Sequence, residues 1–303
     1  VQAGRADDRG LYWARLRCFA AALRAGLAEP SDRDAWLERE RGIDDVAFSG
    51  GADVRVLVTG FDPFFLDRAL GQANPSGLVA LTLDDRAFER EGLRIETQAL
   101  IVPVDYGDFD RGLVERALRP WLAGDRIDLL VTVSMGRDGF DLERFPGRRR
   151  STTAPDNRDV RSGATAEAPL PGRLDGEPLP GPEFLEFSLP AAPMGAVPGP
   201  YAVRDNRTVS TLEDGTFDAP SLGALAGRTA VRGSGGGYLS NEISYRSLRL
   251  RAELGSRVPT GHLHTPRMVG FDPAAAEAIV EQAVRIVLAG AVAVHGAPVP
   301  PSP

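Results

Sequence analysis

Strand-like and helix-like segments alternate along this chain from Val54 onward, and this alternation limits its possible folds more than any other feature. Apolar, β-rich runs predict strands, and capped or amphipathic segments between them predict helices. The expected strands cover residues 54–59, 93–102, 127–135 and 261–265, and the expected helices cover about 74 onward, 108–122, 239–254 and 273–288. Such a pattern predicts a three-layer α/β/α domain over residues 51–295, with a mostly parallel, twisted sheet covered by helices on both faces. We expect the first three strands to be neighbours in the core.

The segments outside this alternation differ in character. Residues 1–50 carry apolar side chains at helical spacing, which predicts a helical extension laid on the main domain; these are Trp13, Leu16, Phe19, Leu23 and Leu27. A second short helix is expected to start at Ser31, before Asp34, Trp36 and Leu37. Residues 146–182 and 196–227 lack periodicity and predict long irregular segments, with a short strand near 184–189 between them. Residues 296–303 predict a flexible tail.

The composition excludes several classes of function. The formal net charge is -7 and no basic stripe is present, so we expect no nucleic-acid partner. The longest apolar run, 286–294, is shorter than the roughly 20 residues that a bilayer span needs, so we expect no membrane association. The sequence has no lysine, which excludes a Walker-A loop and a Schiff-base enzyme. Its one cysteine, Cys18, is expected to be a small buried hydrophobe of the first helix.

Few side chains could act as a nucleophile with its base. Two of the three histidines, His262 and His264, should point to the same face of a strand, so a metal site is one interpretation, although a third ligand with suitable spacing is missing. The third, His295, is expected to be exposed. Ser240 follows a glycine-rich turn at 233–237 and starts a helix, where free backbone amides can stabilise an oxyanion. A simple helix cap would also explain Ser240, and a flexible turn would explain the glycines.

Short motifs follow one another along the chain in a definite order. They are Gly60-Phe61-Asp62-Pro63-Phe64, Asn74-Pro75-Ser76, Val102-Pro103-Val104, Gly136, Leu142-Glu143-Arg144, Pro155-Asp156-Asn157, the octet from Ser234 to Asn241 and Gly261-His262-Leu263-His264-Thr265-Pro266. This series resembles the motifs G-F-x-P-F-G-G, N-P-S, V-P-V, L-E-R, P-D-N, S-A-G-T-Y-V-C-N and G-F-I-H-V-P of the pyroglutamyl peptidase I (pyrrolidone-carboxylate peptidase) family. The likeness spans about residues 54–288 and implies a phosphorylase/hydrolase-like α/β fold.

The resemblance also implies a site. Carried over by position, it makes Ser240 the nucleophile where the family has cysteine, His264 the base and Glu143 the group that orients the base. The expected substrate-binding residues are Phe61, Phe64, Gly236, Gly237 and Arg137, with the two phenylalanines flanking a lactam ring. The implied activity is that of a hydrolase, an omega peptidase that removes an N-terminal pyroglutamyl or similar group from a peptide or small amide. A Ser-His-Glu triad would form an acyl-enzyme, and no cofactor is expected.

The chain departs from the family pattern at the nucleophile. A cysteine paired with histidine can rest as a thiolate, whereas a serine must lose its proton during attack. A Ser-His-Glu triad is chemically sufficient, so a working hydrolase is the first interpretation. The alternatives are an inactive homologue that binds N-terminally cyclised peptides and a scaffold that acts through residues 1–50. Phe65-Leu66 and Arg137 stand where the family has Gly-Gly and glutamine, which changes the pocket floor.

Three expectations concern the cell rather than the site. Family members are commonly oligomeric, so a homo-oligomer agrees with the resemblance. The resemblance implies a cytoplasmic protein, while a chain that starts at Val1 without Met also agrees with secretion. The exclusive use of arginine as the basic residue is typical of a GC-rich bacterial genome.

Overall fold

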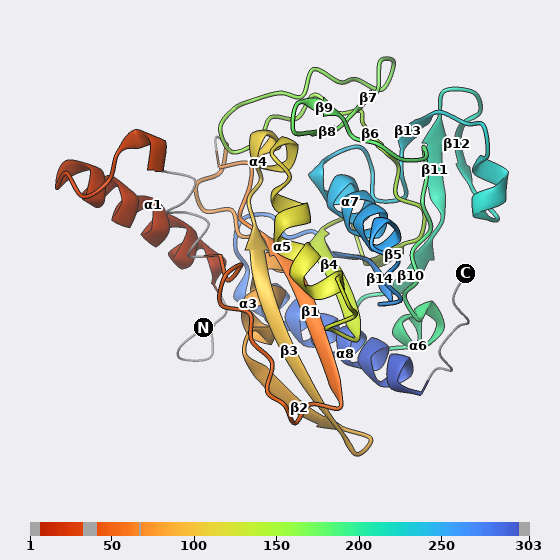
Figure 1. Cartoon of the computed structure of the whole chain (residues 1–303), viewed down its shortest axis with the longest axis horizontal. Helices are drawn as coiled ribbons and strands as arrows, with labels where there is room; N and C mark the ends of the chain where they lie inside the picture. The colour runs from red at the N-terminus through yellow and green to blue at the C-terminus, as the bar shows by residue number, and fades with distance from the viewer. Residues whose placement is uncertain (1–6, 33–40, 67, 297–303) are drawn as a thin grey trace.

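A central sheet organises the chain. The computed structural model describes residues 7–32, 41–66 and 68–296, so the helix expected around 34–37 and the tail from 297 lie outside the described residues. The sheet has seven strands in the order β10-β5-β14-β4-β1-β3-β2, and helices lie on both of its faces (Figure 1). The predicted α/β fold with a mostly parallel sheet and an N-terminal helix is therefore confirmed.

The three strands expected to be neighbours lie side by side at the centre. β1 (Val54–Phe61) pairs in parallel with β3 (Leu93–Val102) on one side and β4 (Leu129–Met135) on the other. β14 (Thr260–Thr265) continues the parallel set beyond β4. Strands not predicted from the sequence complete the two sides of the sheet. At one edge β2 (Arg86–Arg90) pairs antiparallel with β3. On the other side β5 (Phe140–Glu143) pairs antiparallel with β14 and in parallel with the edge strand β10 (Val203–Asn206).

Two helix pairs cover the sheet. On one face α3 (Pro75–Leu83) and α8 (Pro273–His295) enclose the larger apolar core. On the other face α5 (Leu113–Leu122) and α7 (Leu239–Glu253) enclose a second core that includes the β1 residue Leu57. The helix expected over 108–122 is divided into α4 (Tyr106–Asp110) and α5, because Gly112 between them adopts a left-handed φ of 73°. His295, in the last turn of α8, is exposed as expected.

Helix α8 is long and apolar enough, by length and composition, to cross a membrane. Half of its most apolar window is nevertheless buried inside the protein, and Ile279, Ala283 and Ile286 on that side belong to the core. Its apolar composition is therefore accounted for by packing against the sheet.

The first helix, α1 (Asp8–Arg24), buries Phe19 of the predicted apolar face and packs Leu23 partly, but its buried side also includes polar residues that the pattern did not predict. Its buried residues are Asp8, Arg15, Phe19 and Ala22. The expectation that Cys18 is buried is wrong, because its side chain is exposed. Cys18 precedes the buried Phe19 by one residue, and successive side chains are about 100° apart around a helix, so the Cys18 side chain points away from the contact face. Leu27 lies beyond the end of the helix and is 76% exposed.

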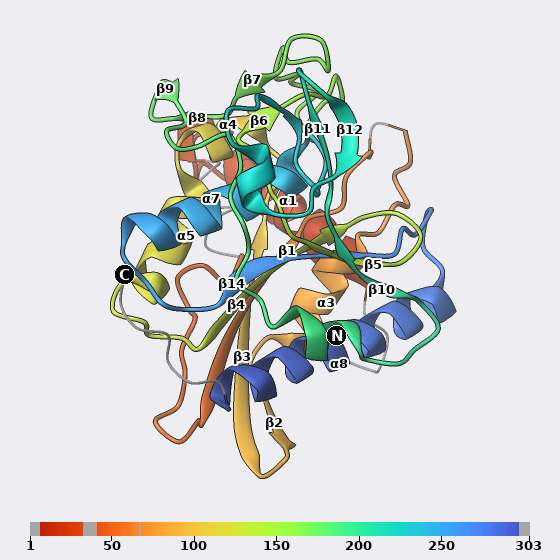
Figure 2. The same cartoon turned by 90° about the vertical axis from the view of Figure 1, so that its right-hand side faces the viewer.

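The irregular segments contain short paired strands. β6 (Arg149–Arg150) pairs with β7 (Leu170–Pro171), and β8 (Arg173–Leu174) pairs with β9 (Glu177–Pro178). Figure 2 shows these ribbons at the same end of the molecule as α4 and the small sheet around β11. The long loop of residues 146–182 is thus folded over the end at which β3 leads into α4.

The structure differs from expectation in the two segments that follow. No continuous strand forms at 184–189. Leu185 N and Phe187 N donate to Pro146 O and Arg144 O, and the pairing of the two segments amounts to an isolated antiparallel bridge between Gly147 and Phe184. The stretch 196–227, expected to be irregular, contains a 3-10 turn at Leu222–Leu225 and three short strands. These strands are β10 (Val203–Asn206), β11 (Thr208–Thr211) and β12 (Gly215–Asp218), of which the last two form a sheet with β13 (Ala230–Arg232); a short helix, α6 (Ala191–Gly195), precedes the stretch.

Candidate functional site

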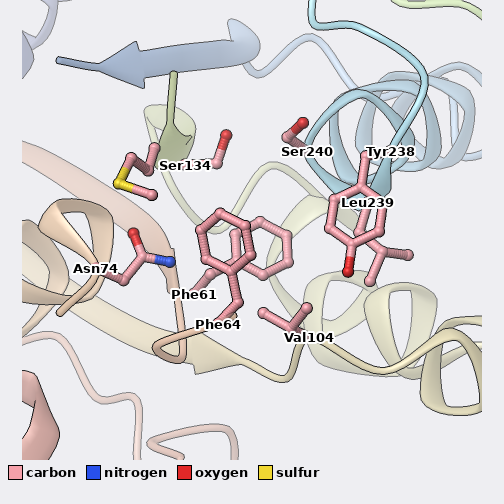
Figure 3. Close-up of a pocket in the computed structure, with 9 residues that line it drawn as sticks. Phe61, Phe64, Asn74, Val104, Ser134, Tyr238, Leu239 and Ser240 are labelled. Atoms are coloured by element: carbon pink, nitrogen blue, oxygen red, sulfur yellow. The ribbon is translucent and has the colours of Figure 1, made fainter. Parts of the chain in front are cut away.

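A small pocket lies where β1 and β4 end and α7 begins (Figure 3). Open α/β sheets bind their ligands beyond the carboxyl ends of the strands, which is where this pocket lies. Its lining is mostly apolar and consists of Phe61, Phe64, Asn74, Val104, Ser134, Met135, Tyr238, Leu239 and Ser240. The pocket therefore suits a small group with apolar faces and few polar contacts.

The turn that carries Phe61 and Phe64 is held from two sides. Side chains at the start of α3 bond to its backbone, since Phe61 N donates to Ser76 Oγ at 3.1 Å and Asn74 Nδ2 donates to Asp62 O at 2.9 Å. From the other side, Asn157 Nδ2 donates to Pro63 O at 2.8 Å. The N-P-S and P-D-N motifs thus have a structural role here, which is to fix the aromatic wall of the pocket.

A hydrogen bond joins His264 to Glu143. His264 Nδ1 and Glu143 Oε1 are 2.5 Å apart, and Glu143 is fully buried. Burial raises the pKa of the Glu143 carboxyl above its usual value, an effect that the neighbouring His264 ring and the Asn206 amide partly offset. Gly136 allows His264 this position, because a Cβ on Gly136 would come within 2.6 Å of the His264 Cβ.

Asn206 completes the support of Glu143. Its Nδ2 donates to Glu143 Oε2 at 2.8 Å and to Ser234 O at 3.0 Å, so both carboxylate oxygens of Glu143 are bonded. The sequence analysis missed this residue, since Asn206 lies at the end of β10 in a stretch that was expected to be irregular. No local sequence signal distinguishes it.

His262, two residues before His264, has different partners. Thr132 Oγ1 lies 2.8 Å from its Nδ1 and Ser134 Oγ lies 2.7 Å from its Nε2. Burial, together with the nearby His264, lowers the pKa of His262 well below 6.5. Because both ring nitrogens already bond to hydroxyl groups, His262 has no free lone pair for the metal ion considered as an alternative.

Ser240 occupies the second position of α7, and the helix cap is Tyr238. Ser240 is therefore not the capping residue, and its hydroxyl donates to Gly235 O at 3.2 Å. The turn before it needs glycine at Gly236, where φ is 93°, and it is anchored where Ser151 N donates to Gly237 O at 3.0 Å. At this end of α7 Asn241 N and Glu242 N donate to Tyr238 O, whereas the amides of Leu239 and Ser240 have no acceptor among the described residues, so these two can bond to an anion.

The structure brings most of the predicted site residues together. Phe61, Phe64 and Ser240 line one pocket, and His264 is paired in the sheet with Ser134, which lines the same pocket. Across the described residues, no hydrogen bond links the Ser240 hydroxyl to the His264 ring. Arg137 is exposed and lies outside the pocket lining.

Ser134 is a second pocket residue that the sequence analysis missed. A signal for it exists: Thr132 and Ser134 are polar residues at alternate positions of an otherwise apolar strand, which places both on one face. The same face carries His262 and His264 on the neighbouring strand, in register with Thr132 and Ser134.

Comparisons with known proteins agree with this architecture. A family model described as "PA0049, C-terminal domain" matches residues 55–175 and 202–269. An uncharacterized protein, PA0049 of Pseudomonas aeruginosa, is 28% identical over 356 residues; the match covers 88% of this chain and 64% of that relative's length. The chain thus spans less than two thirds of this curated relative.

Solved structures share the fold. A mutant pyrrolidone carboxyl peptidase from the hyperthermophile Pyrococcus furiosus superposes with a TM-score of 0.54 at 19% identity, covering 79% of this chain and 99% of that one. The structures of the same Pyrococcus furiosus peptidase and its cysteine-free mutant give the same TM-score, identity and coverage. Identity this low shows a common fold and leaves the activity open.

Proposed function

This chain belongs to the family described as PA0049, C-terminal domain, and we propose that it is a serine hydrolase of the pyroglutamyl peptidase type. Its substrate would be a peptide or small amide with an N-terminal pyroglutamyl or similar cyclic group. The observation that carries the proposal is the 2.5 Å hydrogen bond between His264 and a fully buried Glu143, beside a pocket that contains Ser240. An imidazole oriented by a buried carboxylate is the arrangement that a general base needs.

In the proposed mechanism His264 Nε2 takes the proton of the Ser240 hydroxyl while Oγ attacks the scissile carbonyl. Glu143 keeps the proton on Nδ1 and stabilises the imidazolium. The tetrahedral oxyanion would be held by first-turn amides of α7, and the amine would leave with the proton from His264. Water then hydrolyses the ester on Ser240 by the reverse proton path.

One rearrangement is needed before attack, because the Ser240 hydroxyl must leave Gly235 O and turn toward His264. A neutral hydrogen bond has a net value of about 1 kcal/mol, so this rotation costs little compared with what substrate binding provides. Phe61 and Phe64 would contact the two apolar faces of the ring, as their place in the pocket wall allows.

Substitution of the nucleophile tests the proposal. We expect Ser240→Ala to lower kcat for a pyroglutamyl-linked chromogenic amide on the order of 10³-fold or more, because no other group would form the acyl-enzyme. Ser221→Ala, which changes an exposed serine outside the pocket lining, is the matched control and should leave kcat unchanged. Unchanged hydrolysis by Ser240→Ala would refute the assignment.

A cysteine at this position gives an independent check. In a Cys18→Ser background, which removes the exposed thiol, Ser240→Cys should become sensitive to iodoacetamide, and the sensitivity should require His264. Equal alkylation rates with and without the His264 side chain would argue against the proposed base.

A second candidate is a protein that binds cyclised peptides without cleaving them. The bond from Ser240 Oγ to Gly235 O favours it, because the hydroxyl proton is donated to a backbone carbonyl instead of the base. Calorimetric binding of a pyroglutamyl peptide, with no turnover and no labelling of Ser240 by a fluorophosphonate, would support this candidate against the hydrolase.

A further inference from the structure

The proposed mechanism leaves one buried hydrogen-bonded chain unused. It runs from Gly261 O through Thr132 and His262 to Ser134, and all of its members are buried, with His262 completely so. One end lies inside the sheet and the other, the Ser134 hydroxyl, lines the pocket beside Ser240 (Figure 3).

The direction of the protons along this chain follows from its geometry. Gly261 O, 3.2 Å from Thr132 Oγ1, can only accept a proton; with the single hydroxyl proton of Thr132 donated there, Thr132 accepts the Nδ1 proton of His262. A neutral imidazole has one N–H group, so Nε2 is left as an acceptor. Ser134 therefore donates its proton to His262 Nε2, over 2.7 Å, and presents only oxygen lone pairs to the pocket.

Ser134 and His262 do not form a second nucleophile and base. His262 is fully buried and its pKa is held well below 6.5, so it resists the positive charge that a general base acquires. The Nδ1 atom of His264 bonds to the carboxylate of Glu143, whereas the Nδ1 atom of His262 bonds to the neutral hydroxyl of Thr132. The Thr132–His262 chain therefore orients Ser134 without activating it.

Most other polar side chains of the pocket are already engaged. Asn74 Oδ1 accepts from Ser76 and its Nδ2 donates to Asp62 O. Tyr238 donates its hydroxyl proton to Pro155 O at 2.8 Å, so its oxygen also remains an acceptor. Ser240 is reserved for attack, which leaves the hydroxyls of Ser134 and Tyr238 as the acceptors of the lining; of the two, Ser134 is the one oriented by a buried histidine.

We propose that Ser134 determines specificity by accepting a hydrogen bond from an N–H group of the bound ligand, which in a pyroglutamyl ring is the lactam N–H. The inference rests on the proposed function for the identity of the ring. It predicts that the pocket selects a cyclic amide over the cyclic ester of the same shape, because an ester oxygen would face the Ser134 lone pairs with no proton between them. Discrimination of about 10- to 100-fold in affinity is expected for one such buried contact.

Calorimetry with two ligands tests this selection without turnover. The probes are L-pyroglutamic acid and the γ-lactone acid in which oxygen replaces the ring N–H. The unsubstituted protein should bind the lactam at least 10-fold more tightly, and Ser134→Ala should reduce the ratio to about 1 by weakening lactam binding alone. Thr132→Val, which keeps Ser134 but removes the acceptor of the Nδ1 proton, should also reduce the ratio and covers the case in which Ser134→Ala does not fold.

The outcomes separate the two hypotheses. Equal affinity for both ligands would overturn the role of Ser134 and leave the proposed function standing. Binding of neither ligand would refute the pyroglutamyl assignment, and the lactam contact with it. A measurement on the ligand-free protein adds a direct check: the ¹⁵N shifts of His262 should show the Nδ1–H form without titration between pH 5.5 and 8.5. An Nε2–H form would overturn the inference, since the Ser134 proton would then be free to point into the pocket.

Discussion

His262 and His264 share one strand and one face, yet their partners give them opposite chemistry. The hydroxyl partners of His262 and its complete burial keep the ring neutral. His264 instead bonds to the carboxylate of Glu143, which can stabilise a positive charge on the ring. Two imidazoles two residues apart can thus divide the work of a site: one holds a ligand-facing hydroxyl in place and the other exchanges a proton.

Substitution of Glu143 tests most directly whether His264 has the role of a base that His262 lacks. In Glu143→Gln the side chain keeps its shape but loses its charge, and the amide can stabilise the wrong tautomer of His264. We expect kcat to fall on the order of 10³- to 10⁴-fold with little change in KM. Glu186→Gln, an exposed glutamate, is the control. A loss confined to KM would show that Glu143 acts on binding instead of orienting the base.

At the scale of elements, α1 and the segment after it brace the aromatic wall of the pocket. Arg15 of α1 and Arg41 both form ion pairs with Asp62, which directly follows Phe61, and all three side chains are buried. Asp8 Oδ2 accepts from Asn74 N at 2.8 Å, at the cap of α3. Since the matched family model begins at residue 55, this brace comes from outside the family domain.

Removing one cation of this cluster should destabilise the protein. Arg15→Met leaves Asp62 buried with Arg41 as its remaining partner, so we expect a loss of about 3 kcal/mol in the free energy of unfolding, at the low end of the range for broken buried pairs. Arg17→Met changes an exposed arginine of the same helix and should have an effect within about 0.5 kcal/mol. Urea unfolding measures the free energy of unfolding of both variants. Equal losses in Arg15→Met and Arg17→Met would show that the ion pair with Asp62 does not stabilise the protein.

The same elements show how far sequence could predict the structure. The central strands and α3, α7 and α8 are encoded locally, by β-rich runs and by caps such as Asn74. The burial of Arg15 could not be predicted, because it depends on Asp62, which is 47 residues away along the chain. β10 to β12 have four residues each, too few to display a period.

The candidate site was likewise predictable from the sequence only in part. Motif order predicted Glu143 and His264 as residues of one site; a hydrogen bond joins their side chains, and their catalytic roles stay a prediction. The contact itself depends on β5 running antiparallel beside β14, which no local pattern specified. Asn206 enters the site through the pairing of β10 with β5, which no sequence signal marked. Ser134 had a signal, its alternation with Thr132 in an apolar strand, but its place beside the histidines follows from the pairing of β4 with β14. The role of Ser240 stays a prediction.

At the scale of the whole molecule, a buried ionic cluster ties the long loop to the helix that carries Ser240. Arg246 of α7 is fully buried and bonds to Glu115 of α5 and to Glu242. Arg150, in the loop, bonds to the same Glu242 and to Asp110. Burial would raise the pKa of Glu242, but the two arginines outweigh it and lower the pKa to about 2, so the cluster stays charged across the neutral range.

The pH dependence of global stability should instead reflect Asp8. Burial raises the pKa of Asp8 from 3.8 to about 7, and among the described residues its Oδ1 has no hydrogen-bond partner, as suits a protonated carboxyl. The folded state therefore retains a proton that the unfolded chain releases near pH 3.8. The stability contributed by this group is complete below that pH and is lost as the pH rises through about 7.

Asp8→Asn isolates this contribution, because an amide has nearly the shape of the carboxyl and does not ionise. Relative to the variant, the unsubstituted protein should lose at most about 4 kcal/mol in the free energy of unfolding between pH 4 and pH 8. Asp7→Asn is the matched control: the bond from Arg9 lowers the pKa of Asp7, so its contribution changes only below pH 4. Urea unfolding at intervals across this pH range should show the stability curves of the unsubstituted protein and Asp8→Asn diverging. Parallel curves would mean that Asp8 is ionised in the folded protein. The contact between α1 and α3 would then be a charged one.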